Sequence, residues 1–280
     1  MPAGTTVGPV EIIAHRGASG YHPEMTRDAY EAAFALGADG VECDIQLTAD
    51  GVPVCLHDPT VDRTSDGTGA VNAMTLAELR ELNVGTPQRP QRILTLAELL
   101  ELVADAQHPA ARPGYRPEIF VETKRLGTVA ERRGQLEQAL QRELLAAGMA
   151  TGPGGDLVHL ISFDPGSLAR FRRINPGIHR IYLRKEYPGW PVLRRCEPAG
   201  VAQSPGFAVT RARTAPQALG DRGSRGDRGS RAGAASDTYL YTLNSRADVR
   251  WAHRHNIRWI ATDVPDLARG WCEGATRLGA

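Results

Sequence analysis

Short apolar runs rich in β-branched residues alternate with amphipathic stretches along most of the chain. Strands separated by helical segments are typical of parallel βαβ units, so the pattern predicts an α/β fold. The runs that we expect to form strands are Glu11–Gly17, Gly40–Gln46, Val52–Asp58, Glu118–Lys124, Val158–Phe163, His179–Arg184, Val201–Ser204, Thr238–Asn244 and Ile257–Asp263.

Helical spacing of apolar residues lies between these runs. Thr75 and Thr95 each precede such a stretch and are suited to act as N-caps, because a threonine hydroxyl accepts from the free amides of a first helical turn. The helices expected in the first half of the chain are Arg27–Leu36, Leu76–Leu82, Leu96–Val103 and Val129–Met149.

The nine strand-like runs exceed by one the eight strands of a (β/α)8 barrel. Only the short turn Thr48–Gly51 separates Val52–Asp58 from the run before it, so we expect these two runs to pair locally. The remaining runs then make eight βα units. The sequence predicts one domain over residues 1–280, a TIM (β/α)8 barrel with a small insertion after the second strand; an open doubly wound sheet is the alternative.

One segment interrupts the alternation. Residues 220–231 read GDRGSR twice in tandem, with much glycine and no apolar side chain to bury. The pattern predicts a flexible surface loop over about residues 220–236, which replaces or truncates the helix between the seventh and eighth units.

Composition excludes some partners. The 280 residues carry 33 basic and 32 acidic side chains, so the near-zero net charge gives no general attraction to nucleic acid or membranes. No apolar run is long enough to span a bilayer, the N-terminus lacks a signal pattern, and the four cysteines show no disulfide or zinc spacing. We therefore expect a cytoplasmic protein without stable membrane insertion.

The first strand ends in His15, Arg16 and Gly17. Polar residues at the carboxyl ends of barrel strands face the active-site mouth. An arginine offers a planar fork to a phosphate, and a histidine exchanges protons near neutral pH. A surface histidine–arginine pair without function is the alternative.

The second strand carries two carboxylates, Glu42 and Asp44, which project to the same face because strands have a period of two. Two carboxylates inside a barrel repel unless a cation lies between them, and oxygen ligands favour Mg²⁺ or Ca²⁺ over zinc. An ion pair with neighbouring basic residues is the alternative.

Two further runs add chemistry of the same kind. His57 follows the apolar run after the second strand, and Glu122 and Lys124 lie two apart in the run Glu118–Lys124. Two histidines, three carboxylates and two cations are the parts that metal-assisted attack on a phosphorus ester requires. A lone Glu–x–Lys pair, by contrast, is commonly a salt bridge.

Several motifs occur in the order of a known family, and with them the sequence resembles the glycerophosphodiester phosphodiesterase family. The matching motifs are HRGAS (His15–Ser19), PEMT (Pro23–Thr26), GADGVECDIQLTADGVPVCLHD (Gly37–Asp58), DRTSDGTG (Asp62–Gly69), VETK (Val121–Lys124), SFDP (Ser162–Pro165), YTLN (Tyr241–Asn244) and ATDVP (Ala261–Pro265).

The resemblance implies a TIM barrel that hydrolyses glycerophosphodiesters to sn-glycerol 3-phosphate and an alcohol, with an insertion at about residues 57–95 covering the site. The residues it implies are His15 and His57 for acid/base catalysis, Glu42, Asp44 and Glu122 for one Mg²⁺ or Ca²⁺, Arg16 and Lys124 for the substrate phosphate, and Phe163 and Tyr241 for a substrate wall.

The chain departs from the family pattern at two motif positions. Met25 stands where the family usually has asparagine, and Tyr241 where it usually has tryptophan. Neither change removes an implied ligand or proton carrier. The departures therefore bear on local stability and on the choice of leaving group.

Other functions are weighed against this one. A phospholipase D-like enzyme acting on lysophospholipids or sphingolipids would need an apolar surface for acyl chains, which the sequence does not show. A non-catalytic phosphodiester-binding barrel should have lost a site residue, yet all are present. The leaving alcohol, the metal, the acid/base assignment of the two histidines and the oligomeric state stay open.

Overall fold

The structure, a computed structural model, describes residues 10–106, 115–124, 134–184, 202–205, 236–255 and 257–276. In these ranges each expected strand is found, and most begin or end within two or three residues of the expected position. The strands are β1 (Glu11–His15), β2 (Gly40–Leu47), β3 (Pro53–Cys55), β4 (Glu118–Thr123), β5 (Val158–Ser162), β6 (His179–Arg184), β7 (Ala202–Pro205), β8 (Ser236–Leu240) and β9 (Ile257–Thr262).

The strands form one sheet that curls into a barrel. Their hydrogen-bonded order is β7-β6-β5-β4-β2-β1-β9-β8, and each neighbouring pair in that order is parallel. In the described residues no hydrogen-bonded ladder joins β7 to β8, so the barrel is nearly closed. The parallel barrel predicted from the alternating pattern is confirmed.

The extra strand also lies where the short turn predicts. β3 pairs antiparallel with the end of β2, with Ile45 opposite Cys55 and Leu47 opposite Pro53. The chain turns between them, and the Thr48 amide donates to the Val52 carbonyl at 3.0 Å. β3 is therefore a hairpin partner outside the parallel order.

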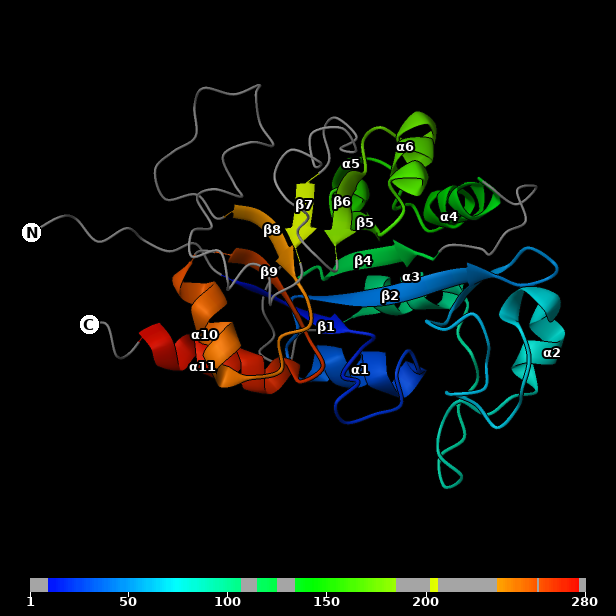
Figure 1. The fold of residues 1–280 in the computed structure, drawn as a ribbon, viewed down its shortest axis with the longest axis horizontal. Helices are drawn as coiled ribbons and strands as arrows, with labels where there is room; N and C mark the ends of the chain where they lie inside the picture. The colour runs from blue at the N-terminus through cyan, green and yellow to red at the C-terminus, as the bar shows by residue number, and fades with distance from the viewer. Residues whose placement is uncertain are drawn as a thin grey trace, which may run out of the picture.

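Helices cover the outside of the barrel (Figure 1). Both threonine caps are confirmed: Thr75 and Thr95 each form a capping box with the glutamate three residues on, Glu78 and Glu98. The helical elements are α1 (Arg27–Ala35), the 3-10 turn η1 (Val71–Ala73), α2 (Leu76–Arg80), α3 (Leu96–Asp105), α4 (Gln135–Ala146), α5 (Gly152–Gly155), α6 (Pro165–Ile174), α10 (Arg246–Arg254) and α11 (Pro265–Thr276).

Some expected boundaries differ. The helix expected over Val129–Met149 begins at Gln135 among the described residues, and residues 129–133 lie outside them. The strand expected to reach Asn244 ends at Leu240, and the Asn244 side chain accepts a hydrogen bond from the backbone amide of Asp263. The GDRGSR loop expected over residues 220–236 also lies outside the described residues, except that Ser236 begins β8.

The core has two layers on either side of the strands. Alternation along β2 sends Val41, Cys43 and Ile45 outward into the larger apolar cluster, where α1, α3 and α4 pack. Cys43 and Cys55 are buried free thiols within it, as their apolar surroundings predict. The barrel interior holds a second cluster: Ile13, Phe120, Ile161, Ile181, Leu183, Tyr239, Trp259 and Ala261.

The segment after β2 has an apolar cluster of its own, formed around β3, η1 and α2. Its connection back to the barrel includes the Cys55 amide, which donates to the Leu94 carbonyl at 2.8 Å. The buried members of the cluster are Val54, Leu56, Val61, Val71, Leu79, Val84 and Ile93.

Polar side chains fill the end of the barrel where the strands begin. Trp259 Nε1 donates to the Glu118 carboxylate at 2.7 Å, and the Nδ1 atoms of His159 and His179 lie 2.9 Å apart. The His159 ring stacks on Phe120. This network closes the end opposite to the carboxyl ends of the strands. No helix in the described ranges is both long and apolar enough to cross a membrane.

Candidate active site

Polar side chains from three neighbouring strands meet at the carboxyl end of the barrel. Parallel register places His15 of β1 beside Glu42 of β2, and Asp44 of β2 beside Glu122 of β4. The period of two turns Glu42 and Asp44 inward, because the residues between and beside them pack against the helices. The sheet itself therefore brings the predicted carboxylates together.

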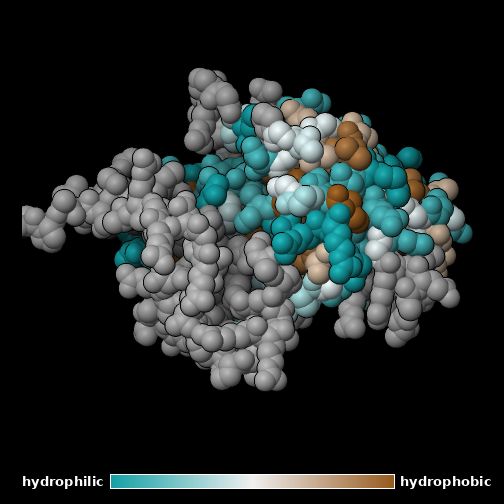
Figure 2. Space-filling view, turned by 90° about the horizontal axis from the view of Figure 1, so that it is seen from above, coloured by the Kyte–Doolittle hydropathy of each residue, from teal (hydrophilic) through white to brown (hydrophobic). Residues whose placement is uncertain are grey.

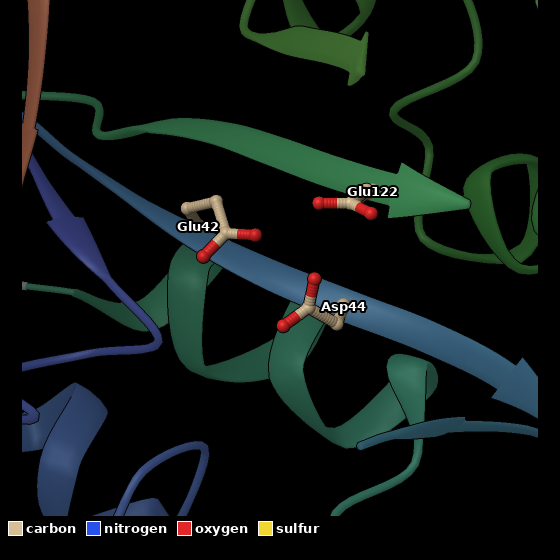
Figure 3. Close-up of side chains that lie close together, drawn as sticks. All are labelled: Glu42, Asp44 and Glu122. Carbon is tan, nitrogen blue, oxygen red and sulfur yellow. The ribbon is translucent and has the colours of Figure 1, made fainter. Parts of the chain in front are cut away.

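The three carboxylates form a compact cluster. One oxygen each from Glu42, Asp44 and Glu122 lie within 4.8 Å of one another, and all three residues are buried. Figure 3 shows the two carboxylates from β2 facing the one from β4. The donor set is all oxygen, the type that Mg²⁺ and Ca²⁺ prefer.

The pKa values of two of these groups show how unfavourable the cluster is when charged. Burial, and then the charges of Asp44 and Glu122, raise the pKa of Glu42 well above its ordinary value. Burial and the charge of Asp44 raise the pKa of Glu122 to about 7. A cation between the three groups would relieve both penalties. The cluster therefore fits a divalent ion by charge, donor type and spacing.

Two basic residues flank the cluster. Lys124 Nζ lies 2.7 Å from Asp44 and 2.6 Å from Glu122, and Arg16 Nε lies 3.1 Å from Asp44. Burial acts to raise the pKa of Asp44, but the charges of Lys124 and Arg16 outweigh it and the pKa is lowered. The two predicted phosphate-binding residues thus lie beside the predicted metal ligands. An anion bound between Arg16 and Lys124 would contact a positive charge on each side.

His15 is oriented by a carboxylate that the sequence reasoning did not single out. Its Nδ1 lies 2.8 Å from Asp263, which follows β9, and its Nε2 lies 4.0 Å from Glu42. Asp263 also accepts from Ser19 Oγ at 3.0 Å and from the Asn244 side-chain amide. Asp263 lies in the motif ATDVP directly after a strand, and this position could have indicated from the sequence that it belongs to the site. With Nδ1 engaged, Nε2 of His15 faces the cluster.

His57 has a similar partner. Its Nδ1 lies 2.5 Å from the carboxylate of the adjacent Asp58, and burial lowers the pKa of the imidazole below its ordinary value. Gln46, the next inward residue of β2 after Asp44, donates to the carbonyls of Leu56 and Asp58 on either side of the histidine. The structure therefore fixes both the backbone and the ring of His57.

Two charged residues near His57 were missed by sequence reasoning. Arg63 donates through Nε to Asp58 and through both terminal nitrogens to Glu24, which also accepts from Arg16 at 3.2 Å. Glu24 lies in the motif PEMT and Arg63 in DRTSDGTG. The motifs carried a signal, but only the fold shows that these side chains meet.

Two aromatic rings lie close together at the same end of the barrel. The rings of Phe163 and Tyr241 meet edge to face, with centroids 5.9 Å apart, and the Tyr241 hydroxyl donates to the Arg184 carbonyl at 2.5 Å. Both residues follow barrel strands, β5 and β8, directly. The structure thus brings together the pair predicted as a substrate wall.

Met25 has an unusual backbone. Its φ is 55°, in the left-handed region that asparagine tolerates better than methionine, and its side chain is buried in the larger apolar cluster. Its amide donates to the Arg16 carbonyl at 2.9 Å. Methionine in place of the family's asparagine is therefore less favourable for the backbone conformation at this position, but it adds buried apolar surface.

A parallel barrel with acidic, basic and imidazole groups gathered at its carboxyl end has the architecture of a barrel hydrolase of phosphate esters. Comparison with known proteins identifies the particular group. Residues 15–267 match the model of the glycerophosphoryl diester phosphodiesterase family, and the chain belongs to this family. It is an enzyme of that type.

Individual relatives agree with this assignment. The chain is 35% identical over 280 residues to a probable glycerophosphodiester phosphodiesterase 1 of Mycobacterium tuberculosis, with 96% of this chain and 94% of that protein covered. It is 29% identical to a glycerophosphodiester phosphodiesterase of Bacillus subtilis, covering 91% of this chain and 84% of that protein.

Solved structures share the fold. A phosphodiesterase of Oleispira antarctica, in complex with the product sn-glycerol-3-phosphate, has a TM-score of 0.74 at 22% identity, with 94% of this chain and 96% of that chain covered. A putative glycerophosphoryl diester phosphodiesterase of Silicibacter pomeroyi has a TM-score of 0.75 at 23% identity, with 96% and 94% covered.

Proposed function

We propose that the chain hydrolyses glycerophosphodiesters to sn-glycerol 3-phosphate and an alcohol at the carboxyl end of the barrel. The observation that carries the proposal is the buried cluster of Glu42, Asp44 and Glu122, flanked by Arg16 and Lys124. The family supports the reaction class, and the Oleispira antarctica structure, with its product bound, supports the product.

Glu42, Asp44 and Glu122 are the proposed ligands of one divalent cation, Mg²⁺ or Ca²⁺. When bound, such an ion polarises a phosphoryl oxygen and lowers the pKa of a nucleophile. The protein's part is to hold three oxygens in place before the ion arrives, on strands whose register is fixed by hydrogen bonds. Asp44 Oδ2 is buried and accepts no hydrogen bond, and its neighbour is the Nε atom of Arg16 at 3.1 Å.

His15 and His57 are the proposed acid/base pair. Each imidazole is held at Nδ1 by a carboxylate, Asp263 or Asp58, which leaves Nε2 to transfer a proton. The lowered pKa of His57 favours its neutral form at pH 7, the form that accepts a proton. Positioned proton transfer of this kind contributes roughly 10²–10⁴-fold in rate.

Arg16 and Lys124 are the proposed phosphate contacts, and Phe163 and Tyr241 the proposed wall for the organic part of the substrate. The guanidinium of Arg16 suits two phosphate oxygens, whereas the ammonium of Lys124 acts as a point charge. We also propose that the chain is one domain, in which residues of about 57–95 are an insertion that packs on its own apolar cluster and carries His57 at its start.

The test is an assay of purified protein on glycerophosphocholine, glycerophosphoethanolamine and a lysophospholipid, with the products identified and each metal supplied in turn. We expect sn-glycerol 3-phosphate from the first two substrates, loss of turnover in excess chelator, and recovery with Mg²⁺ or Ca²⁺. His15→Ala and His57→Ala should each remove most turnover.

Full activity in excess chelator would refute the metal assignment, and near wild-type kcat in either histidine variant would refute its acid/base role. Faster cleavage of the lysophospholipid would instead favour a phospholipase D-like enzyme. The described part of the face shown in Figure 2 is largely hydrophilic, with hydrophobic residues in small separate patches.

A further inference from the structure

Arg63 binds two carboxylates at once. Its Nε donates to Asp58 Oδ2 at 2.5 Å, and its two terminal nitrogens donate to Glu24 at 3.0 and 2.7 Å. Asp58 belongs to the segment after β3, and Glu24 precedes α1. Glu24 and Asp58 are partly buried, whereas the Arg63 side chain is exposed. Arg63 therefore joins two separate segments of the chain from the solvent side.

Each carboxylate also holds a residue of the proposed site. Asp58 binds Nδ1 of His57 at 2.5 Å, and Glu24 accepts from Arg16 at 3.2 Å. The connected path therefore runs from His57 to Arg16 with Arg63 at its centre. Among the contacts described around Asp58 and Glu24, Arg63 is the cation that they share.

The charges agree with this geometry. The hydrogen bond from Arg63 lowers the pKa of Asp58 to about 2, and Arg63 and Arg16 together outweigh burial and lower the pKa of Glu24. Both carboxylates are therefore ionised and fixed by a guanidinium whose planar fork suits them. Without Arg63, the Asp58 side chain could rotate away from His57. The Glu24 carboxylate would then have Arg16 as its remaining cationic partner of the two, which would change the position of the Arg16 guanidinium.

We propose that Arg63 is a positioning residue that sets the orientation of His57 and of Arg16 together. The proposal rests on the proposed function, in which these two side chains act on the substrate. Arg63 itself does not touch the reacting atoms in this scheme. It acts through Asp58 on proton transfer and through Glu24 on phosphate binding.

The chain offers a matched control. Arg89 lies in the same segment, of about residues 57–95, and forms an ion pair with Asp28 of α1, so it too joins this segment to the barrel. Neither Arg89 nor Asp28 contacts a residue of the proposed site in the described structure. The Arg89→Ala variant therefore measures the effect of weakening the attachment of this segment to the barrel. The Arg63→Ala variant measures, in addition, the effect of losing the orientation of His57 and Arg16.

The experiment compares Arg63→Ala, Arg63→Lys and Arg89→Ala with the wild type on glycerophosphocholine with Mg²⁺. We expect kcat to fall about 10- to 100-fold in Arg63→Ala, since a misplacement of about 1 Å costs on this order, together with a rise in KM. Arg63→Lys should recover little, because one ammonium cannot span both carboxylates. Arg89→Ala should keep wild-type kcat and KM.

Chemical rescue separates orientation from damage to the fold. Added guanidinium chloride at millimolar concentration should restore part of the kcat of Arg63→Ala, and sodium chloride at the same ionic strength should not. Absence of rescue in a variant with wild-type thermal unfolding would overturn the proposal. If Arg63→Ala does not fold, wild-type kinetics in Arg63→Lys would overturn it instead.

A failure of the proposed function gives a different result. A wild-type protein that cleaves no glycerophosphodiester refutes that function, and binding of sn-glycerol 3-phosphate, followed by calorimetry, then tests Arg63 directly. Weaker binding in Arg63→Ala than in Arg89→Ala supports its hold on Arg16. Equal binding in the two variants, or equal loss of activity in them, overturns the proposal.

Discussion

Glu122 gives the sharpest test of the acidic cluster, because the loss of folding stability caused by its charge can be measured in the metal-free protein. Its folded-state pKa of about 7 compares with an ordinary value of 4.5, a difference that corresponds to about 3 kcal/mol. The residue is buried, so solvent screens this cost little. Replacing it by glutamine keeps the shape of the side chain and removes the charge.

The pH dependence follows from the direction of the shift. Because the pKa of Glu122 is raised in the folded state, the carboxyl group does not lower the free energy of unfolding below about pH 4.5. The free energy of unfolding falls as the pH rises from there through about 7, where the folded protein loses this proton. In metal-free buffer, Glu122→Gln should therefore match the wild type near pH 4.5 and exceed it by about 3 kcal/mol at pH 8. Lys124 keeps Asp44 as a partner in the variant, at 2.7 Å.

Urea unfolding at a series of pH values measures this difference directly, and other titrating groups cancel between the two proteins. The same gain should appear as a Tm higher by roughly 5–10 °C at pH 8. Adding Mg²⁺ or Ca²⁺ should then stabilise the wild type more than the variant, because only the wild type has all three ligands. A variant no more stable than the wild type at pH 8 would show that the cluster carries no such electrostatic cost.

Three further predictions concern other parts of the molecule. Asp263→Ala should lower kcat about 100-fold with little change in KM, because His15 loses its partner at Nδ1. The control variant Asp266→Ala should leave both constants unchanged in the same steady-state assay. The acid limb of the pH–kcat/KM profile should lie below pH 6.5, because the pKa of His57 is lowered, and a midpoint above 6.5 would contradict its role as the base. Leu79→Ala should cost about 2–5 kcal/mol in urea unfolding, because Leu79 is fully buried in the cluster after β3, whereas the exposed Leu145→Ala should cost under about 1 kcal/mol.

Much of the fold could be predicted because its signals are local. Period-two alternation along Gly40–Gln46 places Glu42 and Asp44 on one face, and the structure confirms this face. The threonine caps at Thr75 and Thr95 are equally local, since each capping box spans four residues. Where a signal of this kind was present, the predicted element and its orientation agree with the structure.

The partners of the site residues could not be predicted in the same way. Asp263 lies 248 residues from His15, and Arg63 lies 39 residues from Glu24. No periodicity connects residues so far apart, and only the closing of the barrel brings β9 beside β1. Lys124 differs from these residues, because it lies two positions after Glu122, and its side chain reaches Asp44 and Glu122 on the face that the period of two predicts.

The location of the three carboxylates on β2 and β4 has a consequence for how the enzyme could diversify. The cluster depends on the register of β2 and β4, whereas Phe163 and Tyr241 lie in connections that follow strands. Substitutions and insertions in those connections leave the register unchanged. A library randomised there should therefore keep the ion-binding cluster while it varies the preferred alcohol, which makes the barrel a natural starting point for selecting new phosphodiesterases.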